Sequence, residues 1–527
     1  MTAKTRYDYL SSERTQFLDE AEQAAELTLP YLIIKDQYTK GMRHLPTPWQ
    51  SVGAKGAVTL AAKLMQSMLP VQTSFFKLQV DESQLGEEFG AQIKSELDLS
   101  FAKIERTILE AIAASNDRVV VHEALLHLVV AGNALIFMGK DGLKVYPLNR
   151  YVVERDGDGN VIEIITKETI AKKLIEDQLP EDVLKQYNTV VDGSDDNVEE
   201  CDIYTHIKRD NNRYVWHQEV HGTVLEKSYG KAPVEVTPWI PLRFNTVDGE
   251  DYGRGRVGQF IGDLKSLEAL SQALVEGSAA AAKVVFTVSP SSTTKPSTLA
   301  NAGNGAIVQG RPDDIGVVQV GKTADFRTAF EMMQQLERRI NDAFLVMQVR
   351  QSERTTAEEV RLTQMELEQQ LGGLFSLLTT EFLLPYLQRI LNQFQKSGKI
   401  PRLPKDIVKP TIVAGVNALG RGQDRESLGQ FLTVISQTMG PEAVQQFINP
   451  EEVIKRLAAS QGIDVLNLVR SMQEIQGEQQ QAQQMAMQQQ QAELGVQAMK
   501  TPMMDPTKNP AMSEGITQQE ATPTPPE

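Results

Sequence analysis

Two glycine patterns in the chain have the spacing of nucleotide-binding motifs. The first, Gly316–Thr323, reads GVVQVGKT and matches the P-loop spacing. In a P-loop, the backbone amides of a flexible turn between a strand and a helix hold phosphate groups. The residues between the two glycines here are Val, Val, Gln and Val, which favour a strand. We therefore expect a strand that leads into a helix, and an ATP-binding protein is the less favoured alternative.

The second pattern, formed by Gly253, Gly255 and Gly258, has the G-x-G-x-x-G spacing of a dinucleotide site. Such a site requires a strand before the glycines and an acidic residue in the following βαβ unit. The preceding residues are an acidic turn, DGED, and no second βαβ pattern follows. We expect a flexible entry to a helix, with Arg254 and Arg256 exposed.

Two further patterns resemble metal sites but lack a required ligand. His127 follows His122 at the fifth position, whereas zinc proteases place the second histidine at the fourth. Asp156–Asn160 imitates the start of a calcium loop, but Lys167 occupies the position of the bidentate acid, so a hairpin turn is favoured. With no metal cluster and no nucleophile–base pair visible, we expect a protein that is not an enzyme and uses no cofactor, metal or catalytic residue.

The composition restricts the partners and the compartment. The 527 residues include 53 Lys and Arg against 69 Asp and Glu, so the net charge of −16 argues against a protein that coats nucleic acid. Cys201 is the single cysteine, which fits synthesis in a reducing cytoplasm. The N-terminus has no apolar signal segment, and the longest apolar run, 125–138, is too short to cross a bilayer. We expect a soluble protein with no membrane contact.

Long helices dominate the predicted elements. Apolar residues at three- and four-residue steps predict helices over 323–346 and 357–396, and a polar break at 347–356 separates them. A third long helix is expected over 252–283, and short strands with Ser, Thr, Pro and Gly over 284–322. The break carries Arg350, Glu353 and Arg354, so it is expected to be an exposed, charged loop.

The remaining N-terminal and C-terminal segments complete an α+β, mainly helical chain. Helices are expected over 5–27, 49–69, 90–115 and 118–131, followed by strands around the turn at 156–160. A second β stretch, from Cys201 to about Val247, alternates like a meander. After 424 we expect short helices, then a Gln- and Met-rich segment, and a final segment too poor in apolar residues to fold.

Several segments between Tyr31 and Asp424 carry a family resemblance. They occur in matching order and include TPWQSVGAKG, EALLHLVVAGNALIFM, YPLNRYVVERDGDGNV, DIYTHI, IPLRFNTVDGEDYGRG, GDLKSLEAL, GRPDDI, TAEEVRLTQMELEQQLGGLFSLLTTEFLLPYL and ALGRGQD. They resemble the portal, or head-to-tail connector, proteins of short-tailed bacteriophages (podoviruses, Autographivirus type). This resemblance implies a ring of about twelve subunits at one capsid vertex, through which double-stranded DNA enters during packaging and leaves during ejection.

The resemblance also implies a division of the chain into the parts of a portal subunit. The expected parts are a wing (1–251), a first stem helix (252–283), a clip (284–322), a second stem helix (323–346), a channel loop (347–356), a long wing helix and return (357–423), a crown (424–475), a barrel helix (476–503) and a disordered tail (504–527). The expected partners are other copies of the chain, DNA without sequence specificity, the major capsid, scaffolding and internal core proteins, the large terminase, and the tail adaptor and nozzle proteins.

Three sets of residues are candidates for these contacts. The channel-loop set is Gln348, Arg350, Gln351, Ser352, Glu353 and Arg354. The clip set, for the terminase and the adaptor, is Ser291, Lys295, Asn301, Asn304, Arg311 and Asp313. The set for packing between subunits in the stem is Leu264, Leu267, Leu270, Phe330, Leu336 and Ile340. Another virion protein, such as an internal core or tail scaffold, is the alternative, and ring symmetry distinguishes the two.

Overall fold

The computed structural model describes residues 2–34, 45–70, 74–80, 91–140, 142–171, 200–282, 285–292, 295–303, 307–309, 311, 313, 315–318, 323–346, 372–401, 408–412, 429, 431–438 and 453. Residues 1–419 and 420–527 form two compact units. In the second unit, residues 431–438 are helical, within the expected crown. The expected channel loop (347–356), barrel (476–503) and tail (504–527) lie outside the described residues.

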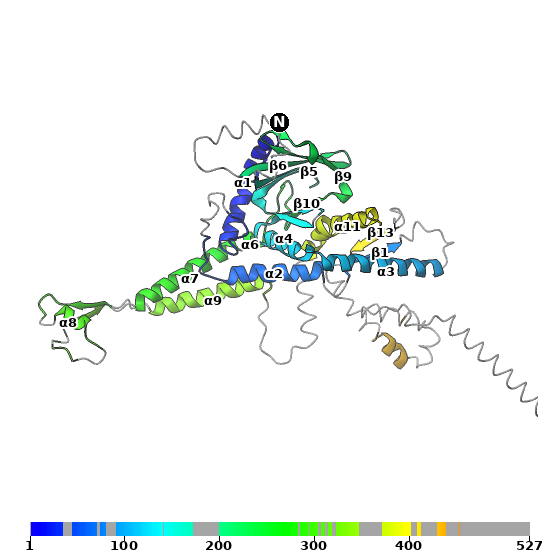
Figure 1. Ribbon diagram of the computed structural model, residues 1–527. Helices are drawn as coiled ribbons and strands as arrows, with labels where there is room; N and C mark the ends of the chain where they lie inside the picture. Colours follow the sequence, from blue (N-terminus) through cyan, green and yellow to red (C-terminus); the bar gives the residue numbers. More distant parts are fainter. Residues whose placement is uncertain are drawn as a thin grey trace, which may run out of the picture. The chain divides into compact units, whose positions relative to one another are not determined.

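A large antiparallel sheet forms one layer of the first unit. Its order is β4-β5-β6-β7-β8, and β9 pairs with β7. The strands are β4 (Tyr151–Arg155), β5 (Val161–Ala171), β6 (Glu200–Asp210), β7 (Arg213–Val220), β8 (Thr223–Val224) and β9 (Gly230–Pro233). Helix α1 (Ala3–Glu26) contacts β4, β5 and β6 and covers this sheet (Figure 1). The strands on either side of the turn at 156–160 and the first part of the second predicted β stretch therefore belong to one sheet.

The end of the second β stretch belongs to a different sheet. Strand β10 (Trp239–Arg243) pairs with β2 (Asn133–Met138), which pairs with β3 (Leu143–Tyr146). The prediction of one continuous meander was wrong here, because alternation along a strand identifies a strand but not its partner. β10 is buried on both of its faces, unlike a strand with one wet face.

Helices and a small sheet surround this second sheet. The helices are α2 (Val52–Met68), α3 (Ala91–Ala114), α4 (Asp117–Ala131) and α11 (Leu384–Lys396), and β1 (Phe76–Val80) pairs with β13 (Val408–Ile412). Short turns of helix lie at Leu148–Arg150, Glu226–Ser228, Val234–Val236 and, as a π-helix, Thr379–Leu383. Helix α4 is buried on almost every side, which explains its continuous apolar run. No helix among the described residues is long and apolar enough to cross a membrane.

Two long helices and a small β module follow. Helix α7 (Ile261–Ala282) and helix α9 (Thr323–Ala343) run side by side (Figure 1). Between them in sequence come β11 (Val285–Val288), α8 (Pro296–Ala300) and β12 (Ile315–Val318), and β11 pairs with β12. The first long helix is shorter than expected, because α6 (Arg256–Gln259) is a separate turn before Phe260.

Candidate channel and assembly surface

The α7–α9 pair is held together inside one chain. Leu264, Leu267 and Ile340 have no exposed surface and belong to the main hydrophobic core. Arg339 adds an ion pair to Asp263 at 2.9 Å. Full burial within a single chain removes the three apolar residues from the set expected to pack between subunits, since a side chain covered by its own chain has no surface left for another.

The outer surface of the same pair remains apolar in places. Val275 on α7 and Phe330 and Met332 on α9 are 53%, 48% and 51% exposed. Leu270 and Leu336, also from the expected set, are partly exposed. Phe330 and Met332 are two residues apart on α9 and therefore lie on different sides of that helix. Exposed large apolar side chains on different sides of the pair are candidates for contacts with other protein chains.

The C-terminal end of α9 is anchored to the body of the unit. Phe344 is fully buried against Gly56 of α2, where an added Cβ atom would lie 2.8 Å from the Phe344 ring. The Arg256 guanidinium donates hydrogen bonds to the Ala343 carbonyl at 2.9 and 3.2 Å, and the Lys63 ammonium donates to the Leu345 carbonyl. Cationic donors satisfy the free carbonyls at a helix end. The chain is thus fixed just before the expected channel loop.

The segment after the loop is anchored as well. Glu381, in the π-helix, accepts hydrogen bonds from Arg243, both from the backbone N–H at 3.1 Å and from the guanidinium at 2.6 and 3.0 Å. The side chains of this ion pair are only 11% and 14% exposed. Tyr386 donates a buried hydrogen bond to Asp117 at 2.7 Å. Burial, together with Asp117, raises the pKa of Tyr386 well above its ordinary value.

The Gly253-x-Gly255 spacing has a packing role. α4 ends at Gly132 with φ of 76°, and a Cβ atom there would lie 2.4 Å from the Gly255 nitrogen. A Cβ atom on Gly255 would lie 2.6 Å from the Val130 carbonyl oxygen. Asn133 exchanges hydrogen bonds of 2.7 Å with both backbone groups of Gly253. The glycines let two backbone segments meet, so the dinucleotide motif is explained by close packing.

The prediction of a flexible entry with exposed arginines was wrong. Arg254 is partly buried and forms ion pairs with Glu20 at 2.9 Å and Glu250 at 2.6 Å. These partners outweigh the effect of burial and raise the pKa of Arg254. An open hollow of about 1090 Å³ lies beside this segment, with Glu20 and Arg254 in its wall. Its arginine is already paired, and the neighbouring carboxylate repels phosphate, which argues against a nucleotide there.

The other pattern matches also have structural explanations. Gly316 lies inside β12, as the strand prediction requires, and residues 319–322 of the P-loop match lie outside the described residues. Asp156 closes the β4–β5 hairpin, where its carboxylate accepts bonds from the backbone of Asp158 and Asn160 at 3.1 and 2.7 Å. His127 is buried in α4, and desolvation lowers its pKa to about 4.

The clip candidates lie on exposed positions of the module between α7 and α9. Ser291, Lys295, Asn301, Arg311 and Asp313 are all exposed, which is compatible with docking. Asn304 and every residue of the channel-loop set lie outside the described residues.

The sequence analysis did not predict the residues that hold the chain before and after residues 347–356. Lys63, Arg243 and Glu381 were not singled out, and Arg256 was expected to be exposed. Their partners are 87 to 282 residues away in the chain, so no local spacing could reveal them. The available signal was an isolated charge within an apolar helical pattern, at Lys63 and Glu381.

A family model described as "Bacteriophage head to tail connecting protein" matches residues 1–468. The chain belongs to this family.

Individual relatives extend the similarity over most of the chain. The chain is 37% identical to the portal protein of Escherichia phage T7 over 482 residues, which cover 89% of this chain and 88% of that protein. It is 36% identical to the portal protein of Enterobacteria phage T3, with the same coverage, and 30% identical to that of Enterobacteria phage SP6 over 91% of this chain and 93% of that protein. A solved chain from the neck of an empty gene transfer agent particle is similar over 79% of this chain and 90% of that chain, with 14% identity and a TM-score of 0.39.

Proposed function

We propose that the chain is a portal protein, which forms a ring of about twelve copies at one vertex of the phage capsid. The ring is the channel for DNA during packaging and ejection. The observation that carries this proposal is the 37% identity to a phage portal protein over 89% of the chain. A structural role in the virion, rather than catalysis, fits the family.

The surface of the α7–α9 pair supports assembly into a ring. A closed ring needs two different complementary faces on each subunit. Val275 lies on one helix of the pair, and Phe330 and Met332 lie on the other, all about half exposed. We propose that these side chains, with Leu270 and Leu336, contact the neighbouring subunit. The fully buried members of the predicted stem set, Leu264, Leu267 and Ile340, instead belong to the main hydrophobic core of the chain.

Charge supports a channel through which DNA slides. Besides the net charge of −16 for the chain, α7 and α9 carry four basic and seven acidic residues, which gives 4 − 7 = −3. Negative walls repel phosphate over a Debye length of about 8–10 Å, so they reduce adhesion. We propose that Arg350 and Arg354 of the channel loop make transient contacts with the duplex, and that Glu353 moderates them.

The clip is proposed as the docking surface for other proteins. Its exposed residues Ser291, Lys295, Asn301, Arg311 and Asp313 combine both signs of charge with amide and hydroxyl groups. Such a surface suits successive, reversible partners, first the large terminase and then the tail adaptor.

Assembly is tested by replacing apolar residues on the stem surface. We expect the double variant Val275→Ser, Phe330→Ser to fold but to form fewer rings, because it removes apolar contact area without touching the core. Sedimentation and negative-stain microscopy measure the ring fraction. Gln334→Ser, at an exposed polar position of α9, is the matched control. Rings formed as efficiently by the double variant as by the control would contradict the proposed contact.

The channel loop is tested in packaging. With Arg350→Ala and Arg354→Ala together, we expect rings to assemble normally and capsids to retain less packaged DNA. Lys77→Ala, at an exposed position on β1, controls for the loss of a basic residue elsewhere. Unchanged packaging and retention in the loop variant would refute the proposed contact.

A further inference from the structure

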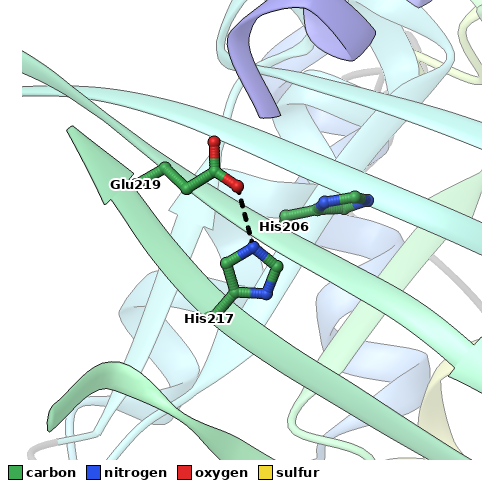
Figure 2. Close-up of side chains that lie close together, drawn as sticks. All are labelled: His206, His217 and Glu219. Carbon is green, nitrogen blue, oxygen red and sulfur yellow. Dashed lines mark hydrogen bonds and ion pairs between the residues drawn. The ribbon is translucent and has the colours of Figure 1, made fainter. Parts of the chain in front are cut away.

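Three side chains that can bind a metal stand on one face of the large sheet. His206 on β6 and His217 on β7 are direct cross-strand partners, and Glu219 follows His217 by two residues on the same face. One ligand atom from each of the three lies within 4.8 Å of the others. Figure 2 shows the His206 ring beside the hydrogen-bonded pair of His217 and Glu219. The strand register thus brings two imidazoles and a carboxylate together.

The carboxylate of the group is oriented by the N-terminal helix. The Ala3 backbone N–H, in the first turn of α1, donates to Glu219 Oε2 at 2.6 Å. Glu219 Oε1 is then directed to His217 Nε2, at 2.9 Å. One oxygen is therefore held by the protein backbone, and the other lies where it can bind a cation together with the imidazole.

The second imidazole is oriented in a similar way. His206 Nε2 is hydrogen-bonded to Glu163 Oε1, and Arg6 holds the other oxygen of Glu163 at 2.7 Å. Because Glu163 occupies Nε2, Nδ1 is the ring nitrogen that remains for a metal. Histidine ligands commonly donate their other nitrogen to a carboxylate, which fixes the tautomer and the ring plane.

Burial and charge favour a bound cation. The side chains of His206 and His217 are 16% and 26% exposed, and that of Glu219 is 9% exposed, so the group is partly enclosed but reachable. Arg6 forms ion pairs with Glu154 and Glu163, whereas the Glu219 carboxylate is bonded to the Ala3 backbone N–H and to His217, so the printed bonds of this group join three carboxylates and one guanidinium. Three negative charges against one positive charge leave −2, which a divalent ion neutralises.

We propose that His206 Nδ1, His217 Nε2 and Glu219 Oε1 bind a divalent transition-metal ion of the zinc type. Imidazole nitrogen and carboxylate oxygen are zinc ligands at about 2.0–2.2 Å, and three protein ligands leave one position for water. The ion takes the place of the proton between His217 and Glu219, and small rotations of the side chains bring the three atoms to it. Through Glu219 and Ala3, the bound ion fixes the start of α1 on the sheet.

The test uses purified full-length protein, free of affinity tags and stripped of metal with a chelator. We expect calorimetric titration with Zn²⁺ to show one strong site per chain, and Co²⁺ to give the intense visible absorption of a four-coordinate N/O site. Glu219→Gln keeps an oxygen that accepts from Ala3 but loses the anionic ligand, and His217→Asn loses the imidazole. Each variant should weaken Zn²⁺ binding at least tenfold, while circular dichroism shows an unchanged fold.

His221→Asn is the matched control. His221 lies in the turn after β7 with φ of 49°, a conformation that asparagine adopts readily. This variant should bind Zn²⁺ as the unmodified chain does. The proposal is overturned if the unmodified chain takes up no stoichiometric Zn²⁺, or if Glu219→Gln and His217→Asn bind it as tightly as His221→Asn.

Discussion

At the scale of single residues, the Arg243–Glu381 ion pair holds the segment that follows the proposed channel loop. Both side chains are largely buried, and Glu381 accepts bonds from the backbone and the guanidinium of Arg243. A buried carboxylate that loses its ion-pair partner is costly, because water solvates it poorly there.

We expect Arg243→Ala to reduce the free energy of unfolding by about 3–5 kcal/mol, the range found when one partner of a buried pair is removed. Urea denaturation of the first cooperative transition measures this change. Arg327→Ala is the control, because Arg327 pairs with Glu331 on the exposed surface of α9. Arg327→Ala should reduce the free energy of unfolding by no more than about 0.5 kcal/mol. Equal effects of the two substitutions would show that the Arg243 pair does not anchor the segment.

His127 gives a prediction for the pH dependence of stability. Desolvation lowers its pKa from 6.5 to about 4 in the folded chain. Between these values the unfolded state binds more protons, so stability is lost as pH falls from about 6.5 to about 4. The loss attributable to this residue is roughly 3 kcal/mol, at about 1.4 kcal/mol for each unit of pKa difference.

We expect His127→Leu to flatten the profile of stability against pH in that window. Thermal midpoints measured from pH 7 to pH 4 provide the comparison. A variant that keeps the slope of the unmodified chain would assign the pH dependence to other groups.

At the scale of elements, the contact of α2 with the end of α9 is tight. Gly56 allows the approach, since an added Cβ atom would lie 2.8 and 3.0 Å from two atoms near the root of the Phe344 side chain. The Cβ atom of Phe344 cannot move without shifting the backbone of the segment that precedes the proposed channel loop.

We expect Gly56→Ala to destabilise the chain by about 1–3 kcal/mol through overpacking. Gly258→Ala is the control, because Gly258 is helical and an added Cβ atom meets nothing within 4 Å. There, alanine should be neutral or stabilising by up to about 1 kcal/mol. Chemical denaturation measures the free energy of unfolding of the two variants. If Gly56→Ala left this free energy unchanged, Phe344 would have room to move, and the contact would not be tight.

The long helices and the strands were predictable because their apolar periodicity is local. α1, α4 and α9 fall within a few residues of their expected ranges, whereas α7 begins at Ile261 and not at 252. The pairing of β10 with β2 was not predictable, because alternation specifies a face and not a neighbour. The stem residues show the same limit: their periodicity marks a buried face, but only the structure distinguishes burial within the chain from burial between chains.

At the scale of the whole molecule, membership of the head-to-tail connecting family and the acidic net charge both support the proposed DNA channel. A chain of this family with a net charge of −16 is suited to surround DNA without binding it tightly. The residues that hold the chain on either side of the proposed channel loop could not be predicted from sequence spacing, because their bonding partners lie in distant segments of the chain. The resemblance to portal proteins provided the expected division into parts, and the structure describes the helices α7 and α9 that this division assigns to the stem.

The central claim is the closed ring. Cryo-electron microscopy of the purified full-length protein, with class averages along the particle axis, tests it most directly. We expect closed rings of about twelve subunits with a central channel wide enough for B-form DNA and with the α7–α9 pairs around it. Discrete particles without a closed ring or a central channel would contradict the account and favour an internal core or tail scaffold.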